Sequence, residues 1–347
     1  MTPTLTGRQL YRRAVRGKVA IVAALPVLIV VVFIINVATG SSDASLADAL
    51  IVLTGGDADP MVATVILDIR VPMALMAIVV GAALSIGGCG MQTILRNPMA
   101  SPFTLGISAA ASFGAALGFI LEANVIRLPG AAMVTGNAFA FALLAAAIIY
   151  LLSLRPGTDK GMIVLLGIAL NFLFNALTML LQYIADEDEL QSLVFWTFGS
   201  LLKTTWQKVA IVSAVLAVAS AIYFRNSWKL TALSLDDHKA KSLGVNVEAL
   251  RRLVIITVSV LAAAAVAFVG TIGFVGLVAP HIARGLVGED QRFFMPASAL
   301  IGAAILSLAF LVSKLVVPGT ILPVGLVTAF VGIPFFIVII VSRRGLA

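Results

Sequence analysis

Long apolar runs alternate with short polar segments along most of the 347-residue chain. A bilayer core of about 30 Å needs roughly 20 apolar residues per helix. Runs of this kind occupy residues 19–38, 72–92, 98–121, 131–153, 160–185, 206–225, 250–270, 293–315 and 324–342. A shorter apolar piece at 274–287 leaves open a re-entrant segment instead of a full span. The pattern predicts an all-α integral membrane protein with about ten transmembrane helices in one domain, residues 1–347.

Composition agrees with this class. The chain is 61% hydrophobic and 11% charged, whereas a soluble domain has about 25% charged residues. Its one cysteine, Cys89, lies inside an apolar run, so the sequence has no disulfide framework and no cysteine-based metal site. Alternating segments of about 10 residues, typical of transmembrane barrels, are absent from the sequence.

The distribution of basic residues supports the count of ten. With ten spans, the segments on the side of the N-terminus hold 18 of the 23 Lys and Arg residues, including Arg343 and Arg344. The opposite side holds five basic residues and ten of the 16 acidic ones. Cytoplasmic loops are enriched in Lys and Arg. Both termini are therefore expected in the cytoplasm, with the first span uncleaved.

The most polar segment after the N-terminus, residues 231–252, predicts a short finished helix. Its expected features are a Ser cap on the amide of Asp237, acidic residues in the first turn, basic residues in the last turn and a left-handed glycine stop. These features fall on Ser234, Asp236, Asp237, Lys239, Lys241 and Gly244. Asn246 predicts the start of the next helix. Local chemistry alone favours a solvated connector over a docking surface.

A stripe of neutral polar residues lies within the fifth span. The stripe has spacings of 4, 3 and 4, which place its members on one helix face: Asn171, Asn175, Thr178 and Gln182. Such residues either hydrogen-bond to neighbouring helices or line a solute path, and the residues themselves leave both readings open.

Several function classes lack their usual motifs. All 16 acidic residues fall in loops or at predicted helix ends, whereas ion-coupled carriers commonly hold a carboxylate or His in mid-membrane. The sequence has no phosphate-binding G-x-x-x-x-G-K-[ST] loop and no Ser-His-Asp, HExxH or Cys/His cluster. Enzyme function has no support, and an ion-coupled carrier remains the competing class.

Five segments together resemble the FecCD-type permease family, the membrane subunits of type II ABC importers for ferric siderophores, haem and cobalamin. The segments are DIRVPMALMAIVVGAALSIGGCGMQTILRNPMASPFTLG (68–106), LGIALNFLFNALTMLLQYIADEDELQSLVFWTFGSL (166–201), the polar loop at 231–246, IGFVGLVAPHIAR (272–284) and LPVGLVTAFVGIPFF (322–336). The resemblance covers the chain from Asp68 to the C-terminus.

The resemblance implies a five-plus-five inverted-repeat fold and roles for particular segments. The loop at about 226–249 would carry the coupling helix that docks on an ATPase subunit, which reverses the preference for a plain connector. The stripe would line the translocation path, and residues 190–202 would form a short outer helix. Arg155, Pro156 and Gly157 would belong to a cytoplasmic gate loop. Arg70 and Lys314 would contact a binding protein, although Met73 stands where the family has a second arginine.

The implied assembly contains more than this chain. Its partners would be a second permease subunit, identical or homologous, two cytoplasmic ATPase subunits that use ATP and Mg²⁺, and an extracytoplasmic substrate-binding protein. The chain itself would bind no cofactor, no metal and no nucleic acid, and would perform no chemistry. It would lie in the lipid bilayer of a bacterial plasma membrane. A ferric siderophore is the expected cargo, with haem and cobalamin as alternatives.

Overall fold

The computed structural model describes residues 7–40, 45–125, 127–130, 132–155, 160–317 and 319–344, and within these ranges the chain is helical without strands. Seven helical segments are long and apolar enough to cross a membrane. They are α1 (Gly7–Ala38), the continuous helix from Pro60 to Leu95 that ends in α4 (Val71–Leu95), α6 (Ala132–Ser153), α7 (Lys160–Ile184), α9 (Trp206–Arg225), α12 (Val247–Val269) and α14 (Gln291–Leu315).

Three further helices are apolar: the shorter α5 (Ile107–Ile120) and α13 (Val275–Val287), and α15 (Val324–Arg344), whose apolar part covers Val324–Val338 among the described residues. Seven and three together match the ten predicted spans one for one within the described residues. The fold class is thereby confirmed. The inverted relation between the two halves stays a prediction.

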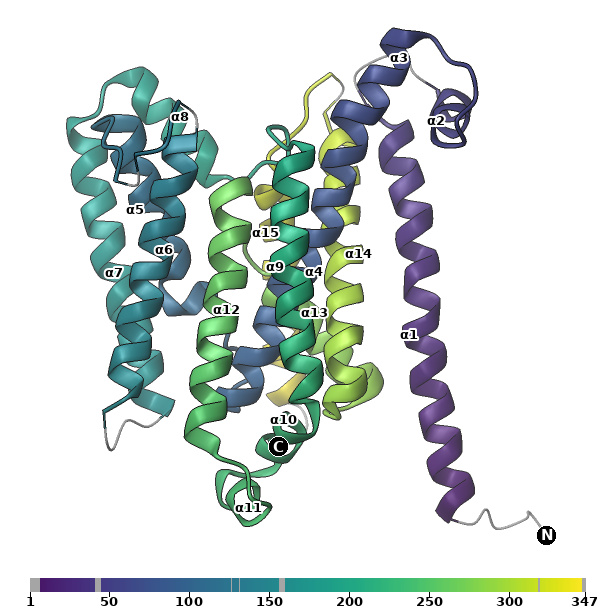
Figure 1. The fold of residues 1–347 in the computed structure, drawn as a ribbon, viewed down its shortest axis with the longest axis vertical. Helices are drawn as coiled ribbons and strands as arrows, with labels where there is room; N and C mark the ends of the chain where they lie inside the picture. Colours follow the sequence, from purple (N-terminus) through teal and green to yellow (C-terminus); the bar gives the residue numbers. More distant parts are fainter. Residues whose placement is uncertain are drawn as a thin grey trace.

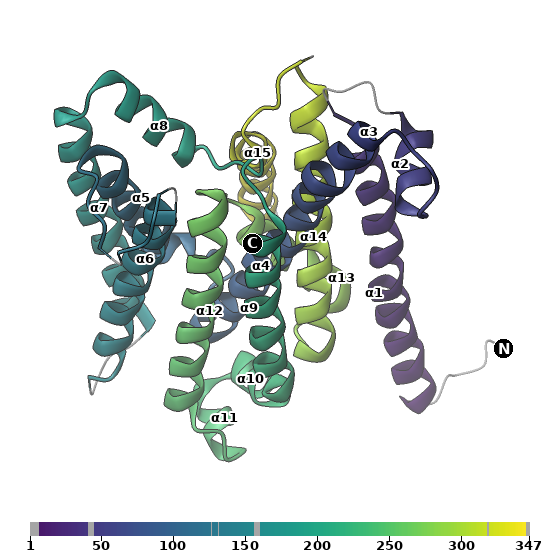
Figure 2. The same cartoon turned by 45° about the horizontal axis from the view of Figure 1, so that its top comes forward.

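The remaining helices lie at the two ends of the bundle (Figure 1). At one end are α2 (Leu46–Leu53), α3 (Pro60–Thr64) and α8 (Glu187–Thr197). At the other end are α10 (Ser227–Leu235) and α11 (Asp237–Ser242), together with the start of α1. In both views α5, α6 and α7 form a group at one side and α1 stands at the opposite edge (Figure 2).

Small residues let α4 approach its neighbours closely at the centre. A methyl group at Gly81 would overlap the carbonyl oxygen of Gly302 in α14, and one at Gly88 would overlap that of Gly276 in α13. Close backbone contact of this kind is how membrane helices associate without a hydrophobic driving force. The four-residue repeat of Gly81, Ser85 and Cys89 therefore serves packing, as its spacing indicates.

Two predicted boundaries were wrong. The second span was expected to begin at Pro72, but its helix begins at Pro60 with Asp59 as the N-cap. A π-helical turn at Val65–Arg70 precedes Pro72, and such a turn accommodates a residue that has no N–H to donate. The third span was expected from residue 98. It begins at Ile107, after Arg96 ends α4 with a left-handed backbone.

Candidate functional site

The polar segment folds as two short helices that form the far end of the bundle (Figures 1 and 2). The chain leaves α10 at Leu235, is extended at Asp236 with φ −173° and ψ 152°, and then forms α11. Gly244 follows with φ +80°, so the predicted left-handed stop is confirmed. Asn246 caps α12 by accepting a hydrogen bond from the amide of Ala249 at 2.9 Å, also as predicted.

The prediction of a single helix capped by Ser234 was wrong. Ser234 lies in the last turn of α10, where its hydroxyl donates to the carbonyl of Thr231 at 2.8 Å. The N-cap of α11 is Asp236, whose side chain accepts no capping hydrogen bond from that helix. The Ser-x-x-Asp pattern is outweighed because residues before Ser234 already continue a helix, and Leu230 and Leu233 of that helix are buried.

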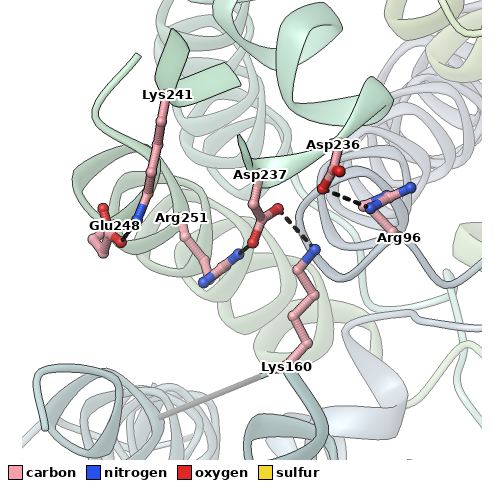
Figure 3. A network of polar contacts seen from close by, with 7 residues as sticks. All are labelled: Arg96, Lys160, Asp236, Asp237, Lys241, Glu248 and Arg251. Atoms are coloured by element: carbon pink, nitrogen blue, oxygen red, sulfur yellow. Dashed lines mark hydrogen bonds and ion pairs between the residues drawn. The ribbon is translucent and has the colours of Figure 1, made fainter. Parts of the chain in front are cut away.

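Asp237 joins α11 to two other helices (Figure 3). One carboxylate oxygen accepts from Lys160 Nζ at 2.8 Å and the other from Arg251 at 2.9 Å. Lys160 is the first residue of α7, and Arg251 lies in the second turn of α12. The three side chains are half-buried, with 25%, 31% and 12% of Lys160, Asp237 and Arg251 exposed. Charged pairs at this distance are about twice as strong as neutral hydrogen bonds.

The electrostatic surroundings keep Asp237 ionised. Burial raises the pKa of its carboxyl group, but the hydrogen bonds and charges of Lys160 and Arg251 outweigh burial and hold the pKa below its usual value. Asp237 is therefore a charged junction between the polar segment, the segment that begins α7 and the start of α12. From the sequence, Asp237 was predicted only in the first turn of the coupling helix, without partners in other helices.

Two weaker ion pairs lie on either side of this junction (Figure 3). Asp236 faces Arg96 at the end of α4, with oxygen and nitrogen 3.4 Å apart. Lys241 and Glu248 pair at 2.7 Å, but their side chains are 54% and 58% exposed. Exposed pairs contribute about 0–1 kcal/mol. The segment is also held by Ala240 and Val245, which are both buried.

The outward face of the segment is apolar at two positions that the sequence analysis missed. Leu235 is 58% exposed and Leu243 is 52% exposed. Lys239 is exposed beside them. Two exposed leucines on a charged, well-anchored segment are typical of a protein contact surface, since apolar side chains dominate the centre of such contacts. The sequence does contain a sign of this surface, since Leu235 and Leu243 flank the charged residues 236–242.

The polar stripe on α7 is divided between a packed and an exposed side. The side chain of Asn171 donates a hydrogen bond to the carbonyl of Phe103 at 3.3 Å. This contact between segments is one of the two interpretations left open by the sequence. Thr178 is 7% exposed and bonds to the Phe174 carbonyl of its own helix. Asn175 is exposed and Gln182 is half-buried. Thr178 therefore does not share an open face with the other three, and a path along them stays a prediction.

The predicted gate loop is described only in part. Arg155 follows the end of α6 and is exposed, whereas Pro156 and Gly157 lie outside the described residues. The first described residue after them is Lys160, the partner of Asp237.

Of the two residues assigned to binding-protein contact, Arg70 is buried and Lys314 is half-buried. Arg70 is 4% exposed and donates to the carbonyls of Val37 and Ala38, both at 2.9 Å. Lys314 donates to the carbonyls of Asn36 at 2.6 Å and Thr39 at 3.3 Å. In this fold the side chain of Arg70 has almost no exposed surface for a binding protein to contact. Contact between Arg70 and a binding protein stays a prediction, and the burial of this side chain counts against it.

Comparison with known proteins decides the family. The family model described as the FecCD transport family matches residues 28–342. The chain belongs to the FecCD transport family. It is 41% identical over 286 residues to a protein of Methanocaldococcus jannaschii named as an ABC transporter permease, covering 80% of this chain and 82% of that relative. It is 34% identical to the molybdate import system permease protein of Haemophilus influenzae, covering 94% and 96% of the two chains.

A solved structure supports the same FecCD assignment. The chain superimposes with a TM-score of 0.81 and 33% identity on a structure of an ABC transporter described as the metal-chelate type in an inward-facing conformation. The match covers 93% of this chain and 99% of that chain. This FecCD protein is thus a multi-pass membrane permease of the ABC importer class.

Proposed function

We propose that this FecCD permease moves a metal chelate across the plasma membrane, and that the exposed leucines that flank α11, Leu235 and Leu243, bind a cytoplasmic ATPase subunit. ATP and Mg²⁺ would be used by that subunit, and the permease itself would perform no chemistry. A second permease chain, identical or homologous, and an extracytoplasmic binding protein would complete the importer.

One observation carries the proposal: exposed leucines on a segment tied to other helices by an ionised carboxylate. Leu243, which directly follows α11, is 52% exposed, whereas Asp237 at the start of α11 bonds to both Lys160 and Arg251. A partner that moved α11 would therefore move the beginnings of α7 and α12 with it. A solvated connector needs neither the leucines nor the anchoring.

Charge distribution supports the orientation in which this end faces the cytoplasm. The segments expected on the side of the N-terminus carry 18 of the 23 basic residues. Figure 1 places the start of α1 at the same end as α11. Under the positive-inside rule this end is cytoplasmic, which is also the compartment that supplies ATP.

The cargo class rests on the relatives. The structural neighbour is described as a transporter of the metal-chelate type, and we propose a ferric siderophore on that ground. Haem and cobalamin are the alternatives within the family resemblance. The relative named for molybdate import, which aligns over 94% of this chain, adds an oxyanion as a second candidate.

Reconstitution tests the function as a whole. The permease, its ATPase subunits and its binding protein are assembled in proteoliposomes, and uptake of ferric siderophore, haemin, cobalamin and molybdate is measured with and without internal Mg²⁺-ATP. We expect saturable uptake of the siderophore only with hydrolysable ATP. Uptake driven by a proton or sodium gradient without ATP would contradict the proposal and support the ion-coupled class.

A further inference from the structure

A polar cavity of about 330 Å³ lies beside the coupling segment, between the last turn of α4, the end of α10, α13 and the start of α14. It has about ten times the volume that one water molecule occupies in the liquid, about 30 Å³. Its charged lining residues are Arg96, Arg284 and Glu289. Two guanidinium groups therefore face one carboxylate, and the cavity has a net positive lining.

Both arginines keep hydrogen-bonding capacity. Arg96 reaches Asp236 at only 3.4 Å, longer than the 2.7–2.9 Å or so of a charge-assisted hydrogen bond. The Nε atom of Arg284 lies 3.2 Å from Glu289 but is buried without a properly directed hydrogen bond. A guanidinium has five N–H donors in a planar fork that fits carboxylate and phosphate oxygens.

Gln92 adds a buried acceptor to the same lining. Its side chain is 1% exposed, and its Nε2 donates to the Leu277 carbonyl at 3.3 Å. This bond fixes the orientation of the amide, and the Oε1 atom is left buried without a hydrogen-bond partner. A buried acceptor without a donor costs about 1–3 kcal/mol. A ligand with an O–H group would satisfy it.

The adjoining helix ends have partners within the chain, so the positive charge of the cavity comes from its arginines. Gln291, the first residue of the 25-residue helix α14, lines the cavity, but its amide donates to the Thr231 hydroxyl and the Asp290 carboxylate caps this helix end. The carbonyl end of α4 is also near, but the carbonyls of Gln92 and Thr93 already accept from the amides of Asn97 and Arg96.

We propose that this cavity is a binding site for a phosphate-class oxyanion. Arg96 and Arg284 would bind its unprotonated oxygens, and a P–OH group would donate to Gln92. Phosphate at neutral pH carries such a group, whereas sulfate and chloride do not. The ligand is either free phosphate or the phosphate monoester of phosphatidic acid, an anionic lipid that also carries a P–OH group.

Occupation of the site has a consequence for the coupling segment. Arg96 would turn from Asp236 toward the oxyanion, so the link between α4 and the start of α11 would weaken. This consequence rests on the proposed function, under which α11 binds the ATPase. Binding itself does not, and it is measured without ATPase or transport.

Equilibrium dialysis of radiolabelled inorganic phosphate against the full chain in phosphatidylcholine nanodiscs tests the site. We expect one saturable site per chain, weakened about ten-fold or more by Arg284→Gln. Arg292→Gln is the matched control, because that arginine is nearby but pairs with Asp290 and does not line the cavity. Arg96→Gln gives a second variant if Arg284→Gln does not fold. Absence of saturable binding, or equal weakening by the control, would overturn the proposal.

Competition separates the chemistry and the source of the ligand. Sulfate is expected to compete about ten-fold more weakly than phosphate, and Gln92→Met is expected to remove that preference. In discs that contain phosphatidic acid, loss of free-phosphate binding identifies the lipid headgroup as the occupant. Unchanged binding identifies free phosphate. Equal competition by sulfate and phosphate would contradict the role of Gln92.

Discussion

Arg70 and Lys314 bind the carbonyl end of the same helix, α1. Their side chains come from the π-helical turn before α4 and from the last turn of α14. Arg70 donates hydrogen bonds to the carbonyls of Val37 and Ala38. Lys314 donates to those of Asn36 and Thr39. The last carbonyls of a helix have no partner within it and form its negative end. Two cations therefore cap α1, whose spanning segment is otherwise only 17% buried.

Removal of either cation should loosen α1. Arg70→Met and Lys314→Met are each expected to destabilise the chain by about 1.5–3 kcal/mol, the cost of losing hydrogen bonds to a charged donor. Thermal unfolding in detergent measures this. Lys203→Met, which replaces an exposed lysine, is the control and should change nothing. If Arg70→Met unfolds as the wild type does but loses association with the binding protein, the docking role that the sequence suggested is correct and the capping account fails.

Asp237 should act as one unit with its two partners. In a double-mutant cycle, Asp237→Asn and Lys160→Gln are expected to reduce ATP-dependent uptake by less together than the sum of their separate effects. Coupling energies of about 0.5–3 kcal/mol are usual for residues in one network. The same cycle on the exposed pair Lys241 and Glu248 should give less than about 1 kcal/mol. Simple additivity at Asp237 and Lys160 would show that the contact transmits nothing.

The Asp237 junction should be insensitive to pH in the physiological range. Its pKa is lowered in the folded chain, so its contribution to stability is complete above the unfolded pKa of about 3.9 and is lost as pH falls through the folded value. Amide hydrogen exchange in α11, corrected for intrinsic rates, is therefore expected to keep the same protection between pH 5 and 8 or so. A loss of protection between pH 7 and 5 would show that another group controls the segment.

The path along α7 has a direct chemical test. With Cys89 replaced by Ser, single cysteines at Asn175 and Gln182 are expected to react with a small water-soluble thiol reagent in the assembled transporter. A cysteine at Leu173 should not react, because a helix turns about 100° per residue and directs it elsewhere. Thr178→Cys should also stay unreactive, since that side chain is buried. Equal labelling of Asn175→Cys and Leu173→Cys would favour the packing reading.

Sequence rules for helix ends gave correct predictions where the hydrogen bonds involved join neighbouring residues. Gly244 and Asn246 were correctly predicted because a left-handed stop and an N-cap depend on a few neighbouring residues. The ten apolar helices followed from length and composition. Ser234 was mispredicted because a helix already runs through it, held by buried Leu230 and Leu233.

Long-range contacts were beyond the sequence pattern. Asp237 and Lys160 are 77 residues apart, and Arg70 meets carbonyls 32 and 33 residues away. The family resemblance assigned Arg70 to a binding-protein contact, and only the packed fold shows which helix end accepts its hydrogen bonds.

The central claim is that the ATPase subunit binds the two exposed leucines that flank α11, Leu235 and Leu243. Its most direct test is the affinity of purified ATPase for the permease in nanodiscs, compared between wild type and Leu243→Glu. Burial of a leucine contributes about 1.5–3 kcal/mol, so the substitution should weaken binding about ten-fold or more without changing thermal unfolding. Leu190→Glu, in α8 at the opposite end and 37% exposed, is the control and should bind as the wild type does. Unchanged ATPase affinity in Leu243→Glu and in Leu235→Glu would contradict the account.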